Sequence, residues 1–292
     1  MESLLGGYGY CVRFAKYQGI GNDFVMIADP GDELKLSAEA VRRVCDRRFG
    51  IGADGVIRVA PGRDGGELLM DYVNSDGSIG EMCGNGIRCL ALFARAEGMT
   101  SARELRVETR AGVKTIEVQP EDRVRVDMGA PIFGPRDIPV DWDGDDALRV
   151  RLTLGSTELE VACLSMGNPH AVWFVEDPHE APVTTLGPAI EHHGAFPRGA
   201  NVEFVRVLSP ERIRMRVWER GSGETLACGT GACAAAVATR LLAGGGERIT
   251  VELPGGEAEV EWRGSLHEAA PVFLTGPAAK VFEGEIGADA WV

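Results

Sequence analysis

Short runs of alternating or clustered apolar residues, four to eight positions long, recur along the chain between Gly, Pro and Asp turns. Runs of this length that are rich in β-branched residues are typical of strands. The pattern therefore predicts a protein built mainly of β structure. The predicted strands are VMIA, VIRVA, LLMDYV, LRVET, VKTIEV, VRVDM, LRVRLTL, LEVACL, AVWFV, VEFVRV, RIRMRVW, ITVEL, AEVEW and VFLTG.

Three stretches carry the signals of helices instead. Ser37 is a candidate N-cap for a helix over residues 38–48, because its hydroxyl can accept a hydrogen bond from the first turn. Two more helices are predicted over residues 87–97 and 232–243, each followed by a glycine. Both are apolar on nearly every face, which predicts that they are buried on all sides.

Three landmarks occur twice, in the same order and at nearly the same offset. The offset is 145 residues for Cys83 and Cys228, 146 for Gly21-Asn22 and Gly167-Asn168, and 147 for Phe49-x-x-Gly52-Ala53 and Phe196-x-x-Gly199-Ala200. A constant offset indicates an internal duplication. We therefore expect an α+β fold of two pseudo-symmetric halves, each a mostly antiparallel, barrel-like sheet wrapped around a central buried helix.

The Pro- and Asp-rich stretch that begins at Ala130 is the natural connection between the halves. The expected boundaries are 1–129 for the N-terminal half, which carries Cys83, and 130–277 for the C-terminal half, which carries Cys228. A pseudo-two-fold arrangement would bring the two cysteine-bearing helix ends face to face, with the active site in the cleft between the halves.

Charge and composition exclude several classes of function. The net charge is −14 and no run of Lys or Arg is present, which argues against binding to nucleic acid or to an anionic membrane surface. The stretch MESLLGGYGY lacks the positive charge of a signal peptide, and no window approaches the roughly 18 apolar residues of a membrane span. We expect a cytoplasmic protein. Seven scattered cysteines without metal-ligand spacing argue against a disulfide framework and a structural zinc site.

Two of the cysteines stand directly before the predicted apolar helices, in the sequences Cys-Gly-Asn-Gly from Cys83 and Cys-Gly-Thr-Gly from Cys228. The first N–H groups of a helix lack partners and the helix dipole is positive there, so a thiolate is favoured and its pKa is expected to fall. The glycines would let a carboxylate reach these N–H groups. Each motif thus combines a reactive sulfur with an anion site.

An amino acid placed between two such sites could be inverted at its α-carbon without a cofactor. One thiolate would remove the α-proton, the opposite thiol would return one, and the helix N–H groups would stabilise the developing negative charge. The alternative for each motif is a small buried hydrophobe. We assign that structural role to the other five cysteines, which are Cys11, Cys45, Cys89, Cys163 and Cys233.

Other polar residues accompany the motifs. Asn74 lies nine residues before Cys83, and Glu219 nine before Cys228. The alternative for Glu219 is a solvated strand end. Several more follow Gly- or Ala-containing turns, namely Asn22, Asn168, His170 and Asn201. The alternative for the asparagines is a structural role, because asparagine is common in turns, where its side chain hydrogen-bonds to the backbone. The string Gly229-x-Gly231-x-x-Ala234 matches a dinucleotide fingerprint, but no parallel βαβ pattern surrounds it.

With these residues in place, the sequence resembles the diaminopimelate epimerases, which interconvert LL- and meso-diaminopimelate for lysine and peptidoglycan precursors. The resemblance extends from about residue 16 to residue 240. It rests on the stretches GIGNDF, DRRFGIGADG, NSDGSIGEMCGNGIRC, MGNPH, NVEF and RVWERGSGETLACGTGACA.

The resemblance implies an acid–base pair of Cys83 and Cys228, no cofactor, no metal and a homodimer. It also implies that the last strand, about residues 278–292, returns to the first half, and that His170 and Glu219 tune the thiols. The substrate-binding residues that it implies are Asn22, Asn74, Gly84, Asn85, Asn168, Asn201, Glu219, Arg220, Gly229 and Thr230.

One position departs from the pattern: some members carry glutamine where this chain has Gly55. The nearest alternative is a proline racemase or hydroxyproline epimerase. Those families have the sequence MCGH where this chain has Met82-Cys83-Gly84-Asn85. Phenazine-type isomerases lack the thiol pair. An alternative of another class is a two-domain binding module with a redox-active cysteine pair.

Overall fold

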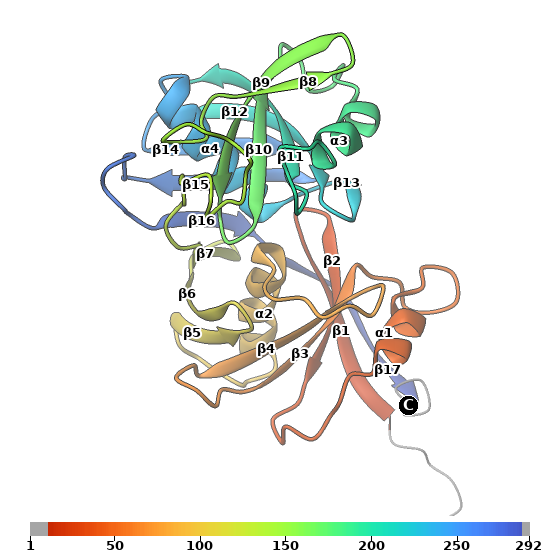
Figure 1. Cartoon of the computed structure of the whole chain (residues 1–292). Helices are drawn as coiled ribbons and strands as arrows, with labels where there is room; N and C mark the ends of the chain where they lie inside the picture. The colour runs from red at the N-terminus through yellow and green to blue at the C-terminus, as the bar shows by residue number, and fades with distance from the viewer. Residues whose placement is uncertain (1–10, 288–292) are drawn as a thin grey trace, which may run out of the picture. The chain divides into compact units, whose positions relative to one another are not determined.

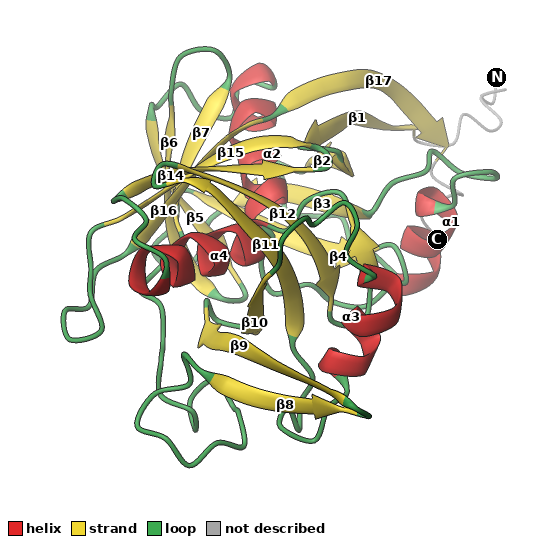
Figure 2. Cartoon of the chain, turned by 90° about the horizontal axis from the view of Figure 1, so that it is seen from above, coloured by secondary structure: helices red, strands yellow, loops and turns green. Residues whose placement is uncertain are grey.

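The computed structural model describes residues 11–287. The first ten residues, on which the expectation about a signal peptide rests, and residues 288–292 of the expected last strand lie outside the described residues. Strands predominate over helices (Figure 2), and the α+β prediction is confirmed. Within the described range, no helix has both the length and the apolar surface needed to cross a membrane.

The described chain forms two compact units. Unit 1 contains residues 11–124 and 277–287, and unit 2 contains residues 125–276. Both ends of the described chain therefore belong to unit 1. There the C-terminal strand β17 (Ala279–Gly287) pairs antiparallel with β1 (Cys11–Gly19), as the blue and red strands of Figure 1 show.

Unit 1 combines antiparallel hairpins with parallel crossovers. Strands β1–β2, β3–β4 and β5–β6 pair antiparallel, whereas β2–β3 and β4–β5 pair parallel. Between β1 and β17 along the chain lie β2 (Asn22–Ala28), α1 (Ala38–Cys45), β3 (Gly55–Pro61), β4 (Leu68–Asn74), α2 (Gly84–Ala96), β5 (Glu104–Thr109) and β6 (Gly112–Val118), and β7 (Arg123–Asp127) runs across the unit boundary.

Unit 2 repeats this order of pairings. Strands β9–β10, β11–β12 and β14–β15 pair antiparallel, whereas β10–β11 and β12–β14 pair parallel. The elements are β8 (Val150–Leu154), β9 (Thr157–Ser165), β10 (Pro169–Phe174), α3 (Val183–Glu191), β11 (Asn201–Ser209), β12 (Arg212–Glu219), β13 (Gly223–Thr225), α4 (Gly229–Leu242), β14 (Arg248–Leu253), β15 (Gly256–Trp262) and β16 (Val272–Pro277).

The strand registers confirm the duplication. Phe24 lies opposite Gly55 in β2–β3, and His170 lies opposite Asn201 in β10–β11, so the pairs occupy equivalent positions. The glycines of the third landmark both have a positive φ, 75° at Gly52 and 67° at Gly199. Its phenylalanines differ, because Phe49 is 92% exposed and Phe196 only 3%.

One helix lies at the centre of each unit, as predicted. Helix α2 packs against β1, β2, β3, β6 and β17, and α4 packs against β9, β10, β11, β12, β14 and β15 (Figure 1). Both begin three residues earlier than expected, at Gly84 and Gly229. Glycine is tolerated there because the first N–H groups of a helix need no partner within it.

The other helices partly depart from the prediction. Ser37 caps α1 as expected, with its Oγ 3.1 Å from the N of Ala40. The helix ends at Cys45 rather than at residue 48, because Asp46 takes an extended conformation. Helix α3 was not predicted, since its sequence contains Gly187 and Pro188, which normally disfavour a helix interior. The predicted strand set also lacked β1.

Four of the five cysteines predicted to be structural are buried, namely Cys45, Cys89, Cys163 and Cys233. The prediction for Cys11 is wrong, because its side chain is exposed. Cys11 is the first residue of β1 and pairs with Gly287 at the end of β17, so it lies at the margin of the described sheet.

Candidate functional site

Cys83 is the N-cap residue of α2. Its backbone is extended, with φ −136° and ψ 118°, and its Sγ accepts the N–H of Gly86 at 3.4 Å. A Cβ on Gly86 would lie 2.7 Å from Cδ1 of Ile57, so the glycine allows the helix end to sit close against β3. The motif thus places a sulfur against the N–H groups of a buried helix.

Asn22, at the start of β2, lies beside this thiol. Its Oδ1 is 3.6 Å from Sγ of Cys83 and accepts the Nδ2 of Asn85 at 3.1 Å. Its own Nδ2 donates to Oδ2 of Asp54 at 2.6 Å. A carboxylate can only accept, so Asp54 fixes which end of the Asn22 amide faces the cysteine. The thiol therefore faces a hydrogen-bond acceptor.

A network of charges anchors Asp54 and the neighbouring Asp23. Arg47 contacts both carboxylates at 2.7 Å, and Lys16 contacts Asp23 at 2.8 Å. Although burial opposes the shift, hydrogen bonds from Arg47 and Lys16 hold the pKa of Asp23 below its usual range. The network keeps Asp23 ionised at neutral pH and holds the Asp54 carboxylate against Asn22.

Arg88 supports the first turn of α2 from inside. It is fully buried, and it donates to the carbonyl of Gly84 at 3.0 Å and to Oδ1 of Asn85 at 2.8 Å. Asn74, at the end of β4, hydrogen-bonds to the hydroxyls of Tyr72 and Ser78. The structure therefore joins Asn22, Cys83 and Asn85 directly, whereas Asn74 hydrogen-bonds within β4 and to the turn that follows it.

Cys228 is the N-cap residue of α4, with φ −119° and ψ 114°. Its Sγ accepts the N–H of Gly231 at 3.4 Å and lies 3.5 Å from Oγ1 of Thr230. A Cβ on Gly231 would lie 2.8 Å from Oε1 of Glu203. The backbone geometry of the two cysteines is thus the same, but the groups beneath them differ.

A chain of side chains extends from Cys228 into the core of unit 2. Asn168 donates its Nδ2 to Oγ1 of Thr230 at 3.3 Å, and its Oδ1 lies 2.9 Å from Nε2 of His170. Nδ1 of His170 lies 2.7 Å from Oε1 of Glu203. Three of the predicted site residues are therefore linked to a carboxyl group that the sequence did not single out.

The environment of Cys228 opposes the predicted fall of its pKa. Burial, followed by the nearby carboxyl of Glu219, raises the pKa of Cys228 well above its usual value. The hydrogen bonds from Thr230 and Gly231 lower the pKa but do not compensate. The expectation of a lowered pKa is therefore wrong for Cys228, because desolvation of the thiolate outweighs the helix end, and at neutral pH this cysteine is a thiol.

The remaining predicted residues of unit 2 lie where β11 begins and β12 ends. Asn201 is buried, donates to the carbonyl of Pro169 at 3.0 Å and accepts the N–H of Arg220 at 2.9 Å. Glu219 is the last residue of β12, as Asn74 is of β4, and it accepts the hydroxyl of Thr225. Arg220 is exposed, and its Nη1 donates to the carbonyl of Arg198.

The sequence reasoning missed three residues of this constellation, each of which left a signal. Arg88 is the one charge in the helical stretch IRCLALF, and Glu203 is a charge within the apolar strand sequence NVEFV. Asp54 directly follows the third repeated landmark. A charged residue at a position that the pattern assigns to the core calls for a polar partner.

At Gly55 the structure explains the absence of a side chain. A Cβ there would lie 2.6 Å from the carbonyl of Val73 and 2.7 Å from Cε2 of Tyr72. Glutamine at this position would therefore require the β3–β4 hairpin to shift. Gly55 is the equivalent of Asn201 in unit 2.

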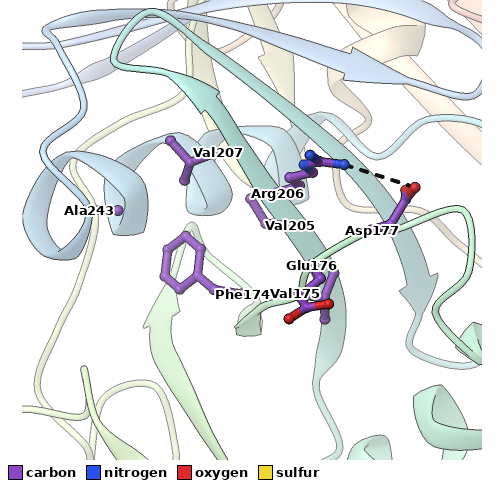
Figure 3. A pocket seen from close by; sticks show the side chains of 8 residues that line it. All are labelled: Phe174, Val175, Glu176, Asp177, Val205, Arg206, Val207 and Ala243. Atoms are coloured by element: carbon purple, nitrogen blue, oxygen red, sulfur yellow. Dashed lines mark ion pairs between the residues drawn. The ribbon is translucent and has the colours of Figure 1, made fainter.

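A surface depression of about 660 Å³ in unit 2 is lined by none of the predicted site residues (Figure 3). Its walls include Phe174 and Val207, and Arg206 forms an ion pair with Asp177 at 4.0 Å. Among residues 11–287, no group of three or more His, Cys, Asp and Glu side chains is arranged to hold a metal ion.

Comparison with known proteins identifies the family. The family model for diaminopimelate epimerase matches residues 14–134 and 162–281. A diaminopimelate epimerase of Moorella thermoacetica is 47% identical over 287 residues, which cover 95% of this chain and 100% of that protein. Diaminopimelate epimerase 1 of a Nostoc species is 46% identical over 281 residues, covering 94% and 99%.

Solved structures of lower identity share the fold. A phenazine biosynthesis protein of the PhzF family from Bacillus anthracis has a TM-score of 0.70 at 17% identity, with 95% of this chain and 99% of that chain covered. A hydroxyproline epimerase from Agrobacterium vitis has a TM-score of 0.69 at 16% identity, covering 97% and 92%. Because the family model matches most of the chain and full-length relatives are nearly half identical to it, the chain belongs to the diaminopimelate epimerase family.

Proposed function

We propose that this protein interconverts LL- and meso-diaminopimelate by inverting one α-carbon with two cysteines. The observation that carries the proposal is the pair of helices α2 and α4, each capped by a cysteine whose sulfur accepts an N–H of the first turn. A duplicated fold with one such cysteine per copy supplies an acid and a base of the same kind. A reaction that inverts either enantiomer at one carbon requires such a matched pair.

In the proposed reaction Cys83 and Cys228 exchange the roles of base and acid when the direction of the reaction reverses. One sulfur takes the α-proton from one face of the substrate, and the other delivers a proton to the opposite face. Because the pKa of Cys228 is raised, we assign it the role of proton donor when the substrate first binds. The reacting carboxylate would lie against the N–H groups at Gly84-Asn85 and Gly229-Thr230, whose dipoles stabilise the carbanion charge.

The distal part of the substrate would be bound by polar residues from both units, with the reaction taking place in a cleft between them. We assign this role to Asn22, Asn74, Asn168, Asn201, Glu219 and Arg220. The Arg220 guanidinium suits a carboxylate because it can donate two parallel hydrogen bonds. His170 and Glu219 would adjust the acidity of the thiols. These assignments rest on family membership and on the positions of the residues around the two N-caps.

The same family membership supports further proposals about the protein in the cell. We infer that it acts without a cofactor, in the cytoplasm and as a homodimer. Its product would serve the biosynthesis of lysine and of peptidoglycan precursors.

Incubation in D₂O with LL-diaminopimelate, and in parallel with L-proline, tests the function. We expect the α-proton signal of diaminopimelate to disappear in NMR spectra while chiral analysis finds the meso isomer, and we expect proline to remain unchanged. Exchange in proline alone would support a proline racemase instead. No exchange in either substrate would refute the two-thiol epimerase and favour a binding module.

A further inference from the structure

Glu203 and His170 distinguish the half of the site around Cys228 from the half around Cys83. By strand register, His170 is the equivalent of Phe24, and Glu203 is the equivalent of Ile57. In unit 1 the glycine of the first helical turn faces Cδ1 of Ile57, whereas in unit 2 it faces Oε1 of Glu203. The duplication thus has an apolar pair, Phe24 and Ile57, at the strand positions where unit 2 has the ionisable pair His170 and Glu203.

Burial of this pair limits the charge that it can carry. The side chains of His170 and Glu203 are both 0% exposed, and Oε2 of Glu203 has no hydrogen-bond partner among the described residues. A buried carboxylate oxygen without a donor is costly, whereas the carbonyl oxygen of a neutral carboxyl group costs far less. The unpartnered oxygen therefore favours the neutral acid.

Hydrogen-bonding capacity shows where the protons of the pair lie. Asn168 presents its Oδ1 to Nε2 of His170, and an amide oxygen only accepts, so Nε2 carries a proton. One further proton then lies between Nδ1 of His170 and Oε1 of Glu203, which are 2.7 Å apart. With the proton on Oε1, both side chains are neutral and every group between them is satisfied.

The same directionality continues to the sulfur. Because Nδ2 of Asn168 donates to Oγ1 of Thr230, the Thr230 hydroxyl can direct its own proton to Sγ of Cys228 at 3.5 Å. Hydrogen bonds aligned in this way polarise one another. The chain from Glu203 thus ends with a donor on the reactive sulfur.

We propose that Glu203 is a positioning residue that stays protonated at neutral pH and, through His170, Asn168 and Thr230, directs a hydrogen-bond donor at Cys228. The proposal rests on the proposed function, since the acidity of Cys228 matters only if this thiol moves a proton. It adds to the site a residue that touches neither the substrate nor the reacting atoms.

The ionisable groups that face Glu203 act on its pKa in opposite directions, and the net shift is upward. Burial is the largest cause that raises the pKa of Glu203, and the carboxyl of Glu219 on β12 raises it further, while His170 on β10 lowers it. Two thiols also face it, Cys228 at the start of α4 and Cys163 on β9, and burial holds the pKa of each above its usual value. Of the groups named here, His170 is the only one that is able to carry a positive charge.

Alkylation of the cysteines by iodoacetamide, without substrate, tests the proposal. The rates at Cys228 and Cys83 are measured between pH 7 and pH 10 by peptide mass spectrometry, in the unchanged protein and in two variants. Glu203→Gln replaces a neutral acid by a neutral amide of the same shape. Glu203→Ile introduces the residue that unit 1 has at this position and removes the bond to His170.

We expect Glu203→Gln to leave the rate at Cys228 unchanged and Glu203→Ile to slow it about five-fold, the effect of about one lost hydrogen bond. Cys83 should be unaffected in both variants. If Glu203 were an anion, Glu203→Gln would remove a nearby negative charge and speed alkylation about ten-fold or more, which would overturn the proposal. An unchanged rate at Cys228 in Glu203→Ile would also overturn it.

Infrared spectroscopy gives an independent measurement if Glu203→Ile does not fold. The C=O stretch of a protonated carboxyl group should be present in the unchanged protein at pH 7 and absent in Glu203→Gln. Identical spectra would overturn the proposal. Neither measurement uses diaminopimelate, so a failure of the proposed function and a failure of this proposal are distinguishable.

Discussion

At the scale of residues, Cys83 and Cys228 share a backbone position but not their surroundings. Each caps a helix, and each sulfur accepts a hydrogen bond from the backbone N–H three residues later, that of Gly86 or Gly231. Cys83 faces the acceptor Oδ1 of Asn22, whereas Cys228 lies beside the hydroxyl of Thr230. The duplication therefore repeats the thiol while allowing each copy its own acidity.

We expect Cys83→Ser and Cys228→Ser each to reduce epimerisation at least about 100-fold, because serine is a far weaker acid than cysteine and proton transfer by a positioned group contributes a factor of this size. The measurement is the rate of α-proton exchange in D₂O. Cys11→Ser, at an exposed position, serves as the control and should behave like the unchanged protein. Turnover near that of the unchanged protein in either cysteine variant would remove that residue from the mechanism.

At the scale of elements, α3 shows packing that overrides intrinsic propensity. Gly187 lies against the ring of Trp218, where a Cβ would be 2.5 Å from Cγ. The ring cannot easily move, because its Nε1 donates to Oε2 of Glu191 at 2.7 Å. Helix propensity alone would make Gly187→Ala stabilising by up to about 1 kcal/mol, but overpacking costs about 1–3 kcal/mol.

We therefore expect Gly187→Ala to lower the free energy of unfolding, measured by urea denaturation followed by tryptophan fluorescence. Thr185→Ala changes an exposed residue of the same helix and should stay within about 0.5 kcal/mol of the unchanged protein. A higher free energy of unfolding in Gly187→Ala would show that the Trp218 ring moves aside and that helix propensity outweighs the packing cost.

At the scale of the whole molecule, the proposed reaction requires the two units to present their cysteines to one α-carbon. Without substrate, two sulfurs placed in this way can approach to bonding distance. We expect diamide, which accepts the two electrons and two protons of the thiols, to join Cys83 and Cys228 and abolish activity, and dithiothreitol to restore it.

Peptide mapping under non-reducing conditions detects this crosslink. Cys228→Ser should prevent it, which distinguishes it from pairing of other cysteines. Recovery of both Cys83 and Cys228 as thiols after oxidation would argue against the facing arrangement.

The sequence by itself determined the features that depend on local pattern and covalent spacing. Apolar periodicity predicted most strands and the two central helices, and constant offsets predicted the duplication that the strand registers confirm. It also placed both cysteines before buried helices. It could not predict α3, whose Gly187 and Pro188 are unfavourable in isolation and are accommodated only by packing against β12.

The tertiary structure alone decided the partners and the acidity of the site residues. Asn22 and Asp54 are 32 residues apart in sequence, and His170 and Glu203 are 33 apart, so no local pattern links them. The pKa of Cys228 depends on burial and on the carboxyl of Glu219 from another strand, which together outweigh the effect of the helix end that the sequence revealed. Desolvation and long-range pairing arise only when the chain is folded, and for that physical reason the sequence could predict the thiols but not their protonation.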